Sequence, residues 1–283
     1  MGILRTRGWL RIVIGFTMAS TAIAAGVGPF GIEVFGNFKR MTHSGDASGT
    51  VKLSDISGRS TTYGIGALAG LRGEVLLWDG RIMVSRGHDR EGRVEPAVAT
   101  DEAALMVIAS VARWEEVDIP MDMTQAQFEA FATREAGRRG LAGSAPFPFA
   151  IKGEFSRVRW HVVTGAAGSA GVHGGGSHAQ GHAQNRVFDQ RDVSGVALGF
   201  YSGDDLEGVI SHPGERFHVH AADLAFTRSG HIDEYAVRKG AKLLLPLRLP
   251  ARATVAPQAL LVGVISAVRA AVDQPDFGDG GGF

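Results

Sequence analysis

Three histidines near the C-terminal end of the chain constrain its fold more than any other feature. His218 and His220 are two positions apart, and His231 follows eleven positions later. Side chains two residues apart on a β-strand point to the same face, so the first two imidazoles converge if this segment is a strand. A third imidazole on a neighbouring strand completes a three-nitrogen site, which for zinc leaves a fourth coordination position open. The spacing therefore predicts a catalytic zinc site.

The connection between the two predicted strands decides whether the three rings meet. A tight turn at 228–229 would place His231 opposite Phe226, roughly 20 Å along the strand from His220. The metal site therefore requires a shorter first strand and a loop over about 223–229, which puts His231 beside His220. The alternative is an exposed His-x-His pair that binds nothing.

The overall composition limits which ligand atoms can hold a metal and which partners the chain can bind. The chain has 283 residues, with 29 basic and 29 acidic side chains, so its lack of net charge argues against nucleic acid as a partner. It has no cysteine, so any zinc must be held by nitrogen and oxygen ligands. Asp223 and Asp233 are the expected acceptors for the imidazole N–H groups.

The first 25 residues have the order of a secretory leader. Basic residues up to Arg11 precede an apolar run, Ile12–Ala25, that ends in small side chains. An uncleaved membrane anchor is the alternative, but a run of about 14 residues is shorter than the roughly 20 that span a bilayer. We expect a cleaved leader over 1–25, an exported protein that is periplasmic or secreted, and no stable membrane anchor.

Two β-rich parts are expected after the leader. The segment 73–80 ends in Asp79-Gly80 and predicts a hairpin, and Thr124 with Gln127 predicts a capping box for a helix over 124–136. Leu105 to Val111 is ambiguous between strand and helix. Further strands are expected over 149–163, 193–201, 216–222 and 231–238, with a last helix over 257–272.

A Gly-, Ala- and Pro-rich loop over 137–148 is the predicted boundary between the two parts. We expect an N-terminal β-rich α/β domain over 26–145, a C-terminal metal-binding β-rich domain over 146–274 and a tail over 275–283. The segment 165–185 is rich in glycine and holds three further histidines, which predicts a flexible insertion rather than a metal trap. These three are His173, His178 and His182.

Several short motifs occur in a fixed order over roughly 49–246. They are 63–68 (Tyr-Gly-Ile-Gly-Ala-Leu), 71–74 (Leu-Arg-Gly-Glu), 79–80 (Asp-Gly), 149–155 (Phe-Ala-Ile-Lys-Gly-Glu-Phe), 195–200, 213–214 (Pro-Gly), 218–220, Asp223 and 230–231 (Gly-His). Taken together, these motifs resemble the α-acetolactate decarboxylase family. The resemblance implies an α/β (α+β) fold of two domains, with a mixed β-sheet in each and few helices. It also implies a Zn²⁺ centre held by His218, His220 and His231.

The same resemblance assigns roles to three further residues. Glu74 matches the family glutamate that moves a proton, although on residue pattern alone it could be an exposed strand residue. A family arginine that meets the substrate falls on His161, with Arg159 two residues earlier on the same strand face. Either side chain could orient the departing carboxylate, or Arg159 could be solvent-exposed. A second family glutamate near the C-terminus has no clear counterpart.

The resulting hypothesis is zinc-dependent decarboxylation of α-acetolactate, or a similar small 2-hydroxy-3-keto acid, to acetoin and CO2. The metal would stabilise the enediolate that forms when CO2 leaves. One alternative is an exported metal-binding or interaction protein of the same fold that has lost decarboxylation. Another is a zinc hydrolase. The sequence does not fix the oligomeric state, and a homodimer is one assembly that we allow for.

Overall fold

The computed structural model describes residues 30–141, 145–165 and 185–247. The leader, most of the His- and Gly-rich insertion, the predicted helix over 257–272 and the tail lie outside the described residues. Within the described part of the chain, no helix has the length and apolar content needed to cross a membrane. All described residues belong to one compact unit, which extends to Leu247.

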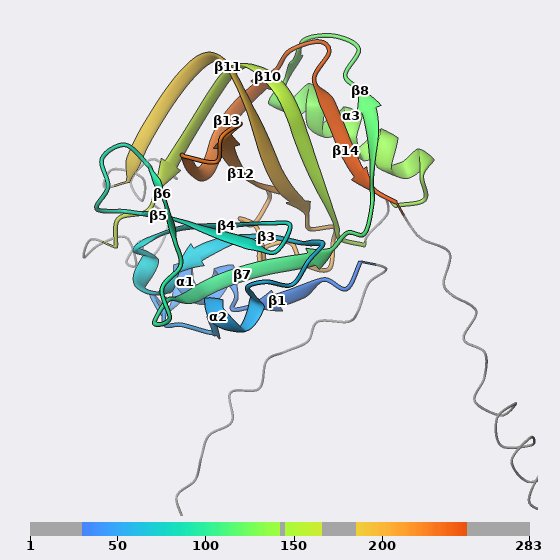
Figure 1. The fold of residues 1–283 in the computed structure, drawn as a ribbon. Coiled ribbons are helices and arrows are strands. Elements are labelled where there is room, and N and C mark those ends of the chain that lie inside the picture. The colour runs from blue at the N-terminus through green and yellow to red at the C-terminus, as the bar shows by residue number, and fades with distance from the viewer. Residues whose placement is uncertain (1–29, 142–144, 166–184, 248–283) are drawn as a thin grey trace, which may run out of the picture. The chain divides into compact units, whose positions relative to one another are not determined.

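The described residues form two seven-stranded sheets and few helices (Figure 1). The first sheet contains β1 (Glu33–Phe35), β2 (Val51–Lys52), β3 (Thr62–Leu68), β4 (Gly73–Trp78), β5 (Arg81–Arg86), β6 (Val94–Pro96) and β7 (Glu102–Ser110). The second contains β8 (Trp114–Asp118), β9 (Met123–Thr124), β10 (Phe147–Val162), β11 (Arg186–Tyr201), β12 (Phe217–Asp223), β13 (Ser229–Val237) and β14 (Lys242–Pro246). The helices are α1 (Phe38–His43), α2 (Leu53–Ile56) and α3 (Gln125–Arg138), with a 3-10 turn, η1 (Ala69–Leu71).

The prediction of an α+β fold with few helices is confirmed, with one correction. Every pairing between the described strands is antiparallel, whereas mixed sheets were expected. Parallel neighbours require long crossover connections, and short links such as the Asp79-Gly80 turn between β4 and β5 join strands in antiparallel order. Both residues of this turn have positive φ, 48° and 79°.

The other local predictions agree with the structure at most positions. The ambiguous segment 105–111 lies largely in strand β7, and helix α3 begins after Thr124 with the expected capping box. Strands β10, β12 and β13 lie close to the predicted ranges, whereas β11 begins seven residues earlier than predicted. The proposed boundary at 145 and 146 stays a prediction. The change from one sheet to the other comes between β7 and β8.

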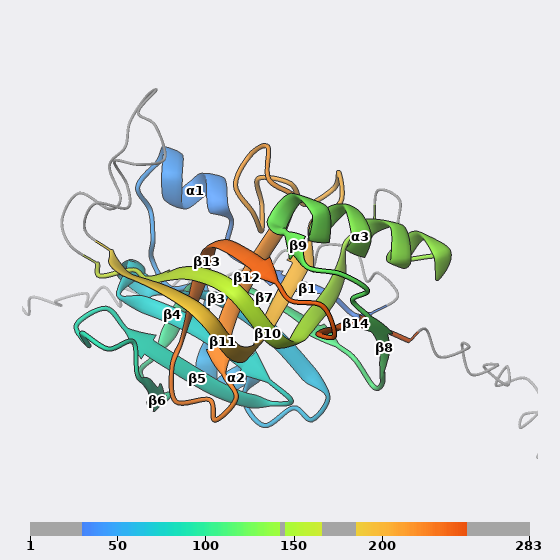
Figure 2. The same ribbon diagram turned by 90° about the horizontal axis from the view of Figure 1, so that it is seen from above.

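An apolar core lies between the two sheets. Buried side chains of the first sheet, including Ile65 and Leu76, pack in one cluster with those of the second, including Phe149 and Val219. Figure 2 shows β10 and β11 lying over the strands of the first sheet. Side chains on β4 alternate between faces, so Glu74 shares the core-facing side with Leu76. A carboxyl group of the first sheet is thereby directed toward the second.

Strand β10 organises the second sheet because it pairs with three other strands. Its 16 residues pair along their length with β11, while its first part pairs with β14 and its last part with β13. Strands β11 and β12 then pair, as do β12 and β13, so the sheet curls back on itself. The end of β10 therefore lies beside β13, which carries one predicted metal ligand and pairs with β12, the strand that carries the other two.

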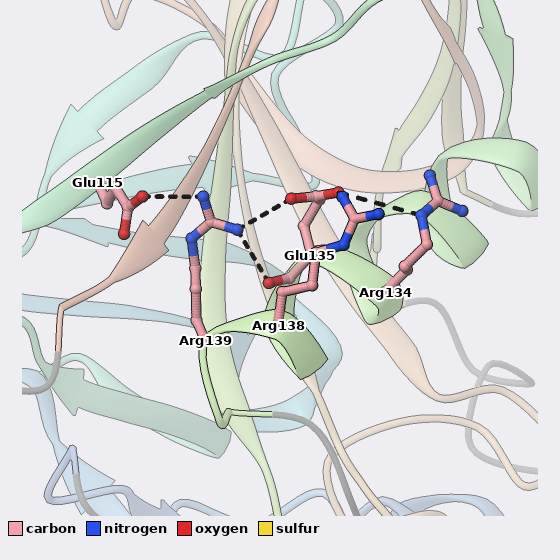
Figure 3. A network of polar contacts seen from close by, with 5 residues as sticks. All are labelled: Glu115, Arg134, Glu135, Arg138 and Arg139. Carbon is pink, nitrogen blue, oxygen red and sulfur yellow. Dashed lines mark hydrogen bonds and ion pairs between the residues drawn. The ribbon is translucent and has the colours of Figure 1, made fainter.

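Helix α3 packs against this sheet through apolar and ionic contacts. Phe128 is fully buried and packs against Phe149 and Tyr235. At the other end of the helix, the buried carboxylate of Glu135 accepts hydrogen bonds from Arg138 at 2.6 Å and Arg139 at 2.9 Å. Arg139 also donates to Glu115 of β8 at 2.8 Å (Figure 3). One guanidinium thus joins the helix to an edge strand.

Removal of the Glu135 charge is expected to destabilise the fold. In Glu135→Gln, two guanidinium groups lose a charged acceptor, so the free energy of unfolding should fall by about 1.5–3 kcal/mol. Urea unfolding followed by circular dichroism measures this change. The matched control is Glu116→Gln on β8, an exposed residue, which should stay within about 0.5 kcal/mol of the unmodified protein. Equal stabilities for the two variants would contradict the assigned contact.

Candidate active site

The register between β12 and β13 brings the predicted metal ligands together. His220 pairs directly with His231, and the strands are joined by a loop over 224–228. This is the longer connection that the metal site requires, and not a tight turn at 228–229. The carboxylate of Asp223 accepts hydrogen bonds from Thr227, including one from its backbone N–H at 2.7 Å. Asp223 therefore holds this loop, and the expectation that it supports an imidazole is wrong.

The three rings form a compact cluster. His218, His220 and His231 each offer one ring nitrogen, and these atoms all lie within 4.8 Å of one another. The distance from His218 Nε2 to His231 Nδ1 is 3.2 Å. Zn–N bonds of 2.0–2.1 Å in a tetrahedral site place two ligand nitrogens about 3.3 Å apart, so this separation fits a zinc ion.

The surroundings of the cluster also fit a cation. His220 is 1% exposed, and neither of its ring nitrogens has a hydrogen-bond partner among the described residues. A buried polar group without a partner costs about 1–3 kcal/mol, and a metal ion would satisfy it. Burial lowers the pKa of all three imidazoles, that of His218 to about 4. They are therefore neutral at neutral pH, which is the form that binds metals.

A backbone carbonyl orients the first ligand. His218 donates its Nδ1–H to the carbonyl oxygen of Ile210 at 2.5 Å, which directs Nε2 toward the other two rings. Ile210 belongs to the connection between β11 and β12, where Val209 accepts a backbone hydrogen bond from Phe38 of α1 at 2.8 Å. The sequence gives no signal for a carbonyl contact of this kind.

Glu74 reaches the cluster from the first sheet. Its side chain is 5% exposed, and Oε2 lies 3.7 Å from Nε2 of His220. The backbone N–H of Val163 donates to Oε1 at 3.3 Å. Burial raises the pKa of the Glu74 carboxyl to about 7, an effect that the nearby His161 partly opposes. This carboxyl can therefore hold or release a proton near neutral pH, and the alternative of an exposed strand residue is excluded.

His161 lies at the cluster, whereas Arg159 does not reach it. His161 pairs with His231 across β10 and β13, and their ring centroids are 4.9 Å apart. Asp233 accepts a hydrogen bond from His161 Nδ1 at 2.7 Å, so it supports an imidazole as expected, though not a metal ligand. The register slips by one residue between positions 159 and 160 of β10. Arg159 is 39% exposed and forms an ion pair with Glu234 at 3.6 Å.

Gly230 permits the close approach of β13 to β10. A Cβ atom at this position would lie 2.5 Å from the carbonyl oxygen of His161 and 2.5 Å from the ring of Trp160. Any larger residue would push the two strands apart. The glycine that precedes His231 therefore lets that imidazole sit beside His161.

One histidine near the cluster was not singled out from the sequence. His212 lies in the β11–β12 connection, with its ring centroid 6.4 Å from that of His231 and 4.1 Å from that of Phe38. It is half-buried. Its only signal in the sequence is its position in the segment directly before His218, because no fixed spacing links a loop residue to a strand pair.

Comparisons with known proteins bear on the family and the fold of the chain. The sequence profile described as alpha-acetolactate decarboxylase matches residues 39–245, more than two thirds of the chain. No curated protein matches the chain.

Several solved structures share the fold. The alpha-acetolactate decarboxylase of Bacillus subtilis strain 168 is 20% identical with a TM-score of 0.60, and that of B. subtilis subspecies spizizenii is 19% identical with a TM-score of 0.59. In both cases the match covers 78% of this chain and 90% of the other. A Staphylococcus aureus protein of unknown function, similar to alpha-acetolactate decarboxylase, is 15% identical with a TM-score of 0.56 over 76% of this chain and 85% of its own. From its match over 39–245, the chain belongs to the alpha-acetolactate decarboxylase family.

Proposed function

We propose that the protein catalyses zinc-dependent decarboxylation of α-acetolactate, or a similar small 2-hydroxy-3-keto acid, to acetoin or its analogue and CO2. Family membership supports a decarboxylase. The observation that carries the proposal is the convergence of two buried imidazoles and one half-buried imidazole from one sheet with a buried carboxyl from the other, 3.7 Å from His220. An imidazole cluster alone would bind a metal, but a proton donor beside it allows a reaction.

The metal would be held by His218, His220 and His231, and would supply positive charge to oxygens of the substrate as a Lewis acid. The three ligands are neutral, so they leave the full charge of the cation available. The Ile210 carbonyl fixes one of these rings before any ligand arrives. The protein thus presents a preformed set of nitrogens rather than assembling one around the ion.

The reaction then requires a proton at one carbon atom. The bond between the carboxylate carbon and C2 breaks, CO2 leaves, and the electron pair spreads from C2 onto the neighbouring ketone oxygen. Glu74 is placed to deliver a proton to C2, which restores the ketone and completes the hydroxyketone product. Burial raises the pKa of this carboxyl to about 7 in the metal-free protein, so the group can carry a proton near neutrality, and the charge of a bound cation acts in the opposite direction. Solvent then reprotonates the group.

His161 is the residue that we assign to substrate orientation. Its hydrogen bond to Asp233 fixes the ring at the side of His231, where a carboxylate bound near the metal would meet it. Arg159 stays a weaker candidate, because its guanidinium pairs with Glu234 and would have to leave this partner to reach the site.

Two further proposals concern the protein in the cell. The leader-like sequence over 1–25 supports export to the periplasm or the medium, with the mature protein free of a membrane anchor. The second proposal is that the protein forms a homodimer, which a measurement of its molecular mass in solution tests.

Loss of one imidazole should weaken metal binding. His220→Ala removes a ligand whose ring nitrogens have no hydrogen-bond partner among the described residues, so zinc affinity should fall at least 100-fold, an order-of-magnitude estimate for a lost ligand. Competition with a chromophoric chelator measures the affinity. His88→Ala is the matched control, because His88 is exposed and does not belong to the histidine cluster. An unchanged zinc affinity in His220→Ala would place the metal elsewhere.

Replacement of the Glu74 carboxyl should slow turnover strongly but leave the metal in place. Glu74→Gln keeps the shape of the side chain but cannot donate a carboxyl proton, so kcat should fall by about 10²- to 10⁴-fold. The assay follows CO2 release from racemic α-acetolactate by the zinc-loaded protein. Glu33→Gln, exposed on β1 of the same sheet, should retain full activity. If the unmodified zinc-loaded protein released no CO2, decarboxylation would be ruled out and a metal-binding role would remain.

A further inference from the structure

We propose that His212 contacts the substrate at the metal site and limits the size of the substituent on C2. This inference rests on the proposed function, because it concerns a residue of the same site. Family resemblance assigned no role to His212, and the sequence did not single it out. Its position follows from the contacts of the loop that carries it.

The β11–β12 connection holds His212 in a defined place. One backbone hydrogen bond joins the two ends of this segment, from Ser202 N–H to Arg216 O at 2.8 Å, and another closes a turn within it, from Glu215 N–H to His212 O at 3.0 Å. The hydroxyl of buried Ser211 donates to Glu215 O at 2.7 Å. The same segment supplies the Ile210 carbonyl that orients His218. The loop therefore holds His212 in a fixed position relative to the metal ligands.

A side chain of helix α1 packs against the His212 ring. The phenyl ring of Phe38 lies 4.1 Å from the imidazole of His212 between centroids, tilted by 60°. The Phe38 N–H donates to Val209 O at 2.8 Å, so the helix and the loop are joined by backbone as well as ring contacts. Together these contacts leave the imidazole little freedom to swing out of the way of a bulky ligand.

The ring lies beside the least buried of the three metal ligands. His218 is 8% exposed and His220 is 1% exposed, whereas His231 is half-buried. A substrate that meets the least buried ligand therefore comes close to His212. The ring of His212 lies 6.4 Å from that of His231 between centroids, with the planes at 70°. A small acid that enters beside His231 meets this imidazole.

The chemistry of the His212 imidazole and the Phe38 ring suits a small polar substrate. A neutral imidazole can donate one hydrogen bond and accept another, which matches the hydroxyl, ketone and carboxylate oxygens of a 2-hydroxy-3-keto acid. The phenyl ring behind it adds bulk but no polar group. We expect a methyl group on C2 to fit beside this pair and a longer alkyl group to meet it.

The test compares His212→Ala and His212→Gln with the unmodified full-length protein, all zinc-loaded, on the 2-methyl and 2-ethyl substrates. The alanine variant should lose about ten-fold in kcat/KM on the 2-methyl acid, as expected for one lost hydrogen bond, and should shift its preference toward the 2-ethyl acid. The glutamine variant should recover part of the loss, because its amide also donates and accepts. His88→Ala is again the control.

A second readout separates this inference from the decarboxylation itself. Calorimetry measures binding of 2,3-dihydroxy-2-methylbutanoate, which lacks the ketone and cannot decarboxylate by this route. Weaker binding of the analogue in His212→Ala, with zinc content and melting temperature unchanged, supports the contact between His212 and the substrate. This support holds even if the unmodified protein releases no CO2. Absence of CO2 release would overturn only the proposed reaction. Unchanged affinity and unchanged substrate preference would overturn the role of His212. So would loss of zinc from His212→Ala, or failure of the unmodified protein to bind the analogue.

Discussion

The site depends on the register in which β12 and β13 pair. His220 stands directly across from His231, and a slip of one residue would turn one of these side chains to the opposite face of the sheet. The loop over 224–228 sets this register, and the carboxylate of Asp223 fixes the loop through Thr227. The charge and hydrogen bonding of a single turn thus decide whether three imidazoles meet or point apart.

The second requirement is that the two sheets pack face to face. Glu74 and the imidazole cluster are carried by different sheets, and only the apolar core between them holds the carboxyl 3.7 Å from His220. The same burial that stabilises the core removes water from the carboxyl and raises its pKa to about 7. The apolar core therefore both stabilises the fold and sets the chemistry of the site. A looser core would move the Glu74 carboxyl away from His220 and would lower the pKa of this carboxyl toward its ordinary value.

Local sequence patterns predicted the parts of this structure that depend on local chemistry. The capping box at Thr124, the Asp79-Gly80 turn and the two-residue spacing of His218 and His220 each follow from neighbouring residues. The sequence could not show that Ile210 would orient an imidazole, since that contact joins a loop to a strand through backbone atoms. It also placed Arg159 and His161 together, whereas the irregular pairing with β13 leaves only His161 at the cluster.

The contact at Gly230 bears on how such sites are recognised in other chains. Three histidines at the same spacing would not suffice in a protein with a larger residue before the third one, because the strand could not approach the carbonyl oxygen of His161. A methyl group is enough to prevent the approach. The absence of a side chain at this position is therefore a requirement for the centre in addition to the imidazoles, and a pattern built from ligands alone would accept chains that cannot form it.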